Sequence, residues 1–109
     1  MIDWERLNEL RDEIGPEDLA DVVSVFLDET DEVIAGIRGL GADQMESRLH
    51  FLKGSALNLG LTAFADLCQE GEKRAAAGLP DPVDLDRLVA LYHSSKSTFL
   101  GALAQGTAA

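Results

Sequence analysis

Residues 49–60, LHFLKGSALNLG, combine the apolar spacing of an α-helix with an unusual outer face. At about 100° per residue, the apolar seam of this helix covers an arc of about 80°. Its members are Met45, Leu49, Leu52, Ala56 and Leu59. His50 lies roughly 140° from the centre of the seam, which predicts that it faces solvent. Lys53, Gly54 and Leu57 lie within about 60° of His50 on the same side.

This outer face is poorly suited to a helix that only supports a fold. A glycine inside a helix costs about 0.5–1 kcal/mol relative to alanine, and an outward leucine gains nothing from the core. Close approach of another molecule to the imidazole would explain both residues, because Gly54 leaves room and Leu57 offers an apolar anchor. Lys53 adds a cation beside the ring. A lone surface histidine usually has no function, but these neighbours favour a site at His50.

Proline and glycine divide the rest of the chain into intervals with the three- and four-residue apolar spacing of amphipathic helices. No interval alternates as a strand does. We expect an all-α fold in one domain over 1–109, an antiparallel four-helix bundle with a short additional N-terminal helix as a lid. Asp81 and Pro82 supply a cap and a first-turn proline for the last helix. The predicted helices span 3–14, 16–39, 43–59, 62–77 and 82–104.

Composition excludes several classes of protein. The chain has 20 acidic and 9 basic residues and a net charge of −11. We therefore expect neither a nucleic-acid nor an anionic-membrane surface, because both require a basic face. The sequence shows no signal peptide and no apolar run of about 20 residues, so a soluble, cytoplasmic protein is expected.

The residue inventory offers little catalytic chemistry. Cys68 has no cysteine partner, and His50 and His93 lack neighbours at metal-ligand spacing, so no metal site is expected. Glycine-rich phosphate loops and hydrolase motifs are absent from the sequence, which argues against an autonomous enzyme. For Lys96, near the apolar stripe of the last helix, we expect the ammonium to extend into water.

Glu72 is the second anomaly. It lies about 40° from Cys68, within the apolar stripe of the helix 62–77. A carboxylate at the margin of a core needs a partner, and the preceding antiparallel helix offers the ring of His50. A carboxylate on one ring nitrogen fixes the tautomer and leaves the other nitrogen free as a nucleophile. The alternative is that Glu72 leans out into water.

The His-x-x-Lys-Gly run with Ser55, Asn58 and Gly60 resembles the signature of histidine-containing phosphotransfer (HPt) domains, and Cys68 and Glu72 continue it. The order of the helices is also similar. The resemblance implies a phosphorelay intermediate that takes a phosphoryl group from an aspartyl phosphate of one response-regulator receiver domain and passes it to another. It implies a phosphohistidine carrier rather than an autonomous enzyme.

The resemblance also implies roles for individual residues. His50 would be the phosphoacceptor, Lys53 the cation near the phosphoryl oxygens and Glu72 the group that holds the ring. Partner-binding residues would be Gly54, Leu57, Phe51 and Gln69. The partners would be receiver domains and a sensor histidine kinase. We expect a monomer without a cofactor of its own, and magnesium on the partner receiver.

Three positions depart from the family pattern: Leu49 replaces the usual alanine, Phe51 the usual threonine, and Gly71 a common leucine. The first two could alter partner choice. The alternatives are a phosphoacceptor domain of a chemotaxis-type histidine kinase and a non-catalytic helical adaptor that binds receiver domains. The carrier and the adaptor both use the surface around His50, and the presence of the histidine itself favours the carrier over the adaptor.

Overall fold

The computed structural model describes residues 2–79 and 84–104, and every regular element in this part of the chain is a helix. The predicted all-α class is confirmed. The elements are α1 (Trp4–Ile14), α2 (Pro16–Gly36), the short 3₁₀ turn η1 (Ile37–Gly39), α3 (Ala42–Leu59), α4 (Thr62–Ala76) and α5 (Leu85–Ala104).

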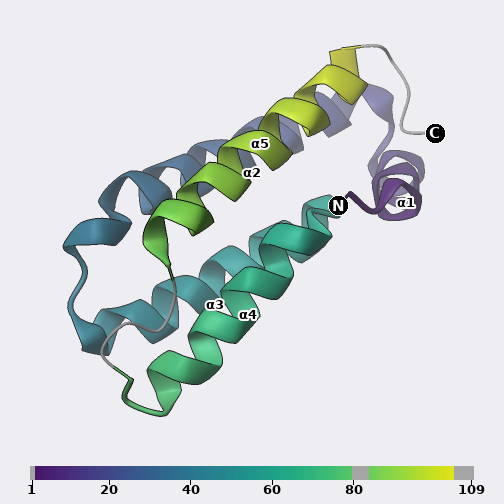
Figure 1. Ribbon diagram of the computed structural model, residues 1–109. Coiled ribbons are helices and arrows are strands. Elements are labelled where there is room, and N and C mark those ends of the chain that lie inside the picture. Colours follow the sequence, from purple (N-terminus) through teal and green to yellow (C-terminus); the bar gives the residue numbers. More distant parts are fainter. Residues whose placement is uncertain (1, 80–83, 105–109) are drawn as a thin grey trace.

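The four long helices lie in two pairs. Figure 1 shows α2 beside α5 and α3 beside α4, with α1 at one end of the molecule. The helices α3 and α4 run in opposite directions, and each helix from α1 to α4 also contacts the next one along the chain. The α3–α4 pair is therefore the framework that positions side chains on its outer face.

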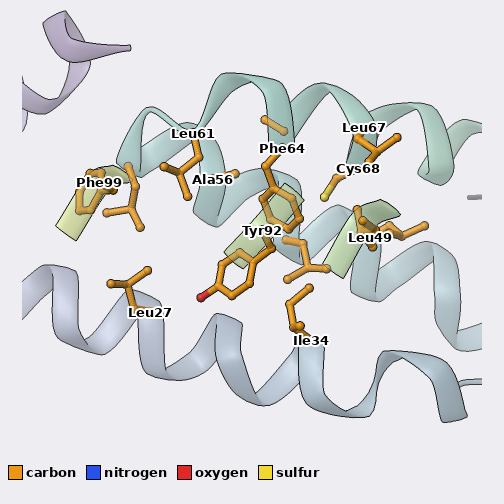
Figure 2. Close-up of a cluster of buried hydrophobic side chains, with 14 of the residues drawn as sticks. Leu27, Ile34, Leu49, Ala56, Leu61, Phe64, Leu67, Cys68, Tyr92 and Phe99 are labelled. Carbon is orange, nitrogen blue, oxygen red and sulfur yellow. The ribbon is translucent and has the colours of Figure 1, made fainter. Parts of the chain in front are cut away.

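The core lies between these helices, as Figure 2 shows. All five residues of the α3 seam predicted from the sequence are buried. They share one core with Leu27 and Ile34 of α2. In the same core, Phe64 of α4 packs against Tyr92 of α5, with their ring centroids 5.2 Å apart. Burial of a large apolar side chain contributes about 1.5–3 kcal/mol, so the seam fixes the rotation of α3 about its axis.

One helix ends earlier than predicted. The apolar spacing predicts a helix over 16–39, but α2 ends at Gly36 and residues 37–39 form η1. Gly36 has φ −98° and ψ 0°, outside the helical region, and the chain then tightens to a bond from the Leu40 N–H to the Ile37 carbonyl. Apolar spacing continues through this change because Ile37 is still buried.

The other helix boundaries agree with the prediction to within one residue, except at the start of α5. The expected start at 82, with Asp81 and Pro82, lies outside the described residues. Asp84 instead accepts the N–H of Arg87 on its Oδ1 at 3.2 Å, as an N-cap residue does. At the start of α1, Asp3 accepts the N–H of Arg6 in the same way.

Lys96 does not extend freely into water, contrary to our expectation. Its Nζ lies 2.7 Å from Asp31 Oδ2, and the hydroxyl of the buried Tyr92 donates to Asp31 Oδ1 at 2.5 Å. Burial raises the pKa of Asp31, but the bonds from Lys96 and Tyr92 outweigh this effect and hold the pKa below its ordinary value. The apolar spacing within one helix could not predict this pair, because Asp31 and Lys96 belong to helices far apart in the chain. The network joins α2 to α5.

Gly60 forms the turn between α3 and α4 and also anchors α1. Its φ of +80° lies in the left-handed region, and the Leu61 N–H closes the end of α3 on the carbonyl of Ala56. The carbonyl of Gly60 accepts the N–H of Asp3 at 2.6 Å. A Cβ at position 60 would lie 2.7 Å from the carbonyl oxygen of Asp3. Only glycine therefore allows this approach.

We predict that Gly60→Ala destabilises the protein more than Gly78→Ala. Gly78 has a similar φ of +78°, but a Cβ there would have no neighbour within 4 Å. Gly78→Ala should lower the free energy of unfolding only by the cost of the left-handed conformation, about 1–2 kcal/mol. Gly60→Ala should lower the free energy of unfolding by more, because its methyl group also displaces α1. Urea denaturation of both variants measures the difference, and equal losses would contradict a close approach of Asp3.

Candidate functional site

The packing of α3 determines where His50 points. Leu49 and Leu52, which flank His50 in the sequence, are fully buried in the seam. The opposite face of α3, which carries His50, is therefore turned away from the core. The side chain of His50 is 67% exposed. An exposed ring on a fixed helix is accessible to a macromolecular partner.

Glu72 of α4 binds two residues of α3. Its Oε1 lies 2.7 Å from Nδ1 of His50, and its Oε2 lies 3.1 Å from Nζ of Lys53. The structure therefore brings together the three residues that the sequence analysis assigns to phosphoryl transfer. Glu72 does not lean out into water, because its side chain is only 21% exposed.

The pair between Lys53 and Glu72 is the contact that sequence reasoning missed. Lys53 was expected beside the ring, but without a partner of its own. A signal existed, because His50 and Lys53 are three residues apart and neighbouring positions on a helix can share one carboxylate. In this structure the cation next to the imidazole is bound by Glu72.

The hydrogen bond fixes which nitrogen of His50 is available. A carboxylate only accepts hydrogen bonds, so the proton of the neutral imidazole lies on Nδ1 and the lone pair on Nε2. Within the part of the chain that the structure describes, Nε2 has no hydrogen-bond partner. The nitrogen with the lone pair is therefore the one left free in an exposed side chain.

Charges around Glu72 keep it ionised. Burial raises the pKa of Glu72, but the hydrogen bonds and charges of Lys53 and His50 outweigh it, so its pKa lies below the ordinary value. The carboxylate is therefore negative at neutral pH and can stabilise positive charge that develops on the ring.

Two residues leave the approach to His50 open. Gly54 is exposed, and a Cβ built there would have no heavy atom within 4 Å. Leu57, one turn further along α3, is 52% exposed. Together they leave open space and an apolar contact on the face of α3 that carries His50.

Phe51 of α3 and Gln69 of α4 lie outside the cluster that Glu72 forms with His50 and Lys53. Phe51 is half-buried and packs against the core next to α2. Gln69 is exposed on α4 and forms no hydrogen bond with His50, Lys53 or Glu72. The structure places both near the surface but does not join them to the Glu72 cluster.

Other titratable groups among the described residues offer no competing site. No three metal-ligating side chains gather there. Burial, followed by the nearby charge of Glu72, raises the pKa of the Cys68 thiol to about 12, so the thiol is unreactive. No helix in the described ranges is long and apolar enough to cross a membrane.

Comparison with known proteins identifies one family. The family model described as Hpt domain matches residues 21–98, which includes all of α3 and α4. No curated protein and no solved structure gives a significant match. The family model covers well over half of the chain. The chain therefore belongs to the histidine-containing phosphotransfer (Hpt) domain family, whose members act in two-component phosphorelays with receiver domains and kinases.

Proposed function

We propose that His50 accepts a phosphoryl group from an aspartyl phosphate of one response-regulator receiver domain and passes it to another receiver domain. The observation that carries this proposal is the exposed imidazole, which is bound through Nδ1 to Glu72 and so leaves Nε2 free. The Nε2 lone pair attacks phosphorus, the bond from phosphorus to the aspartyl oxygen breaks, and the aspartate leaves as a carboxylate. The return step reverses these bonds on a second receiver.

Glu72 and Lys53 are assigned complementary electrostatic roles. Nδ1 keeps its proton during the transfer, and the carboxylate of Glu72 stabilises the imidazolium that forms. Lys53 lies one turn from His50, and its partly exposed ammonium can move from Glu72 to the phosphoryl oxygens. Phosphoryl transfer depends mainly on positioning and on stabilisation of charge, so a nucleophile with these two neighbours is sufficient on this side of the complex.

The receiver supplies the rest of the chemistry in this proposal. Magnesium is carried by the partner receiver, and this chain needs no cofactor of its own. The protein acts as a carrier rather than an autonomous enzyme, and a sensor histidine kinase starts the relay. Gly54, Leu57, Phe51 and Gln69 are the proposed contacts with the receiver.

The proposal extends to the form of the protein. The common core and the contacts between consecutive helices support an antiparallel four-helix bundle with α1 as an additional short helix. The net charge of −11 supports protein partners rather than nucleic acid or an anionic membrane. We place this bundle in a monomeric, cytoplasmic protein.

The first test identifies the acceptor. Incubation with a phosphorylated receiver and magnesium should give an acid-labile, base-stable phosphoprotein. His50→Gln should abolish the label, because the glutamine amide is not a nucleophile. His93→Gln is the control, since His93 is exposed on α5 beside Tyr92. Label that persists in His50→Gln would remove the central claim.

The same assay separates the alternatives. A phosphoacceptor domain of a chemotaxis-type kinase would take label from ATP through a kinase catalytic domain and not from a phosphorylated receiver. An adaptor would bind the receiver without taking label. Label from the receiver alone supports the carrier.

A second test concerns access to Nε2. Gly54→Gln should keep or slightly raise the thermal stability, because glycine is unfavourable inside a helix. Phosphoryl transfer should fall at least about tenfold, because the new side chain lies between His50 and the receiver. Gly101→Gln is the matched control, since Gly101 is also exposed in a helix with open space around it. Equal transfer rates in the two variants would show that the partner does not cross Gly54.

A third test separates charge from docking. Lys53→Ala should lower the transfer rate at saturating receiver by about tenfold or more, because the cation acts on the transition state. Leu57→Ala should mainly raise Kd, because a leucine buried only in the complex contributes about 1–3 kcal/mol, or roughly 5- to 150-fold. Single-turnover transfer at increasing receiver concentration measures both quantities. Interchanged effects would refute these assignments.

A further inference from the structure

The core face of α5 contains one polar residue. Leu88, Tyr92, Ser95 and Phe99 are all completely buried, and Figure 2 shows Tyr92 and Phe99 among the buried side chains. The hydroxyl of Ser95 has no hydrogen-bond partner in the part of the chain that the structure describes. A buried hydroxyl without a partner destabilises the packed state, because water bonds to it in the exposed state. The packing of α5 onto the core is therefore weakened at its centre.

Polar side chains join α5 to α2. The backbones of these two helices lie further apart than those of α3 and α4, and long side chains span the distance. Asp31 of α2 accepts the hydroxyl of Tyr92 on Oδ1 and the ammonium of Lys96 on Oδ2. A further pair, between Arg38 of η1 and Asp86 of α5, is exposed, and such pairs contribute little to stability. Asp31 is therefore the principal polar attachment of α5 to α2.

The helices α3 and α4 are attached to each other without the help of α5. They share the closest backbone packing in the described part of the chain. Glu72 of α4 also joins the two helices through His50 and Lys53 of α3. All three side chains belong to α3 and α4, so their mutual bonds do not depend on the position of α5.

We propose that α5 opens as a unit while α3 and α4 stay packed together, and that the bonds of Asp31 to Tyr92 and Lys96 hold α5 closed. Proteins open in cooperative units, whose opening free energies range from near zero up to that of global unfolding. Two features place α5 at the lower end of this range: the unsatisfied hydroxyl on its core face and a polar attachment that depends on one carboxylate.

The open state has a surface that the closed bundle lacks. Phe64 of α4 packs against Tyr92 in the closed state, and departure of α5 uncovers it. The face of α3 that carries His50 is unchanged, because α5 contributes nothing to the cluster around Glu72. The inference is therefore independent of phosphoryl transfer.

Native-state hydrogen exchange measures this opening residue by residue. After correction for intrinsic rates, the amides of Tyr92 and Ser95 in the middle of α5 should exchange at least about tenfold faster than those of Leu49 and Leu52 in α3, which require global unfolding. Asp31→Asn should accelerate all four amides at least about tenfold. The reason is that it weakens the closed state relative to both the open state and the globally unfolded state.

The matched control is Glu72→Gln, which also converts a carboxylate with a lysine partner into an amide. The bonds of Glu72 are present whether α5 is closed or open. Glu72→Gln should therefore accelerate exchange at Leu49 and Leu52 and leave exchange at Tyr92 and Ser95 unchanged. Circular dichroism of both variants establishes that the helices are retained.

A second variant tests the core face and does not depend on the folding of Asp31→Asn. Ser95→Ala removes the unsatisfied hydroxyl, so exchange at Tyr92 should become at least about fivefold slower. Equal exchange free energies in α5 and α3, with equal changes in every variant, would show that α5 unfolds only with the whole protein and would overturn the proposal. Unchanged exchange of α5 in Asp31→Asn would refute the role of that carboxylate.

Discussion

The hydrogen bond and ion pair that Glu72 forms with His50 and Lys53 are the contacts on which the site depends. They join α4 to α3, fix the tautomer of the imidazole and hold the neighbouring cation. A single carboxylate can bind both groups only if the two helices keep a constant separation and register. The buried seam of α3, with Leu49 and Leu52 wholly enclosed, provides that constancy. Rotation of α3 by even one position would expose a leucine and separate His50 from Glu72.

The turn at Gly60 sets the register of the same two helices. Its left-handed conformation reverses the chain within two residues, so the end of α3 and the start of α4 are fixed relative to each other. The bond from Asp3 to Gly60 brings α1 to this end of the molecule. The residues at the turn lie away from the chemistry, yet they determine whether Glu72 reaches His50.

A second polar network stabilises the other pair of helices. Asp31, Tyr92 and Lys96 join α2 to α5, and Tyr92 also packs on Phe64 of α4. Both carboxylates, Asp31 and Glu72, lie at the edge of the core with lysine partners, which lowers the pKa of each. As the pH falls through these lowered values, protonation weakens both networks and the stability that they contribute is lost.

The amino-acid sequence alone predicts the helices, the buried seam of α3 and the exposure of His50, because these follow from the 3.6-residue period and from local turn residues. It also indicated that Glu72 needs a partner. Three features emerge only in the folded structure: Glu72 binds Lys53 as well as His50, Lys96 pairs with Asp31, and α2 ends at Gly36. The contacts of both lysines depend on the distance and rotation between helices, which side-chain packing sets. A periodic pattern within one helix carries no information on those two quantities.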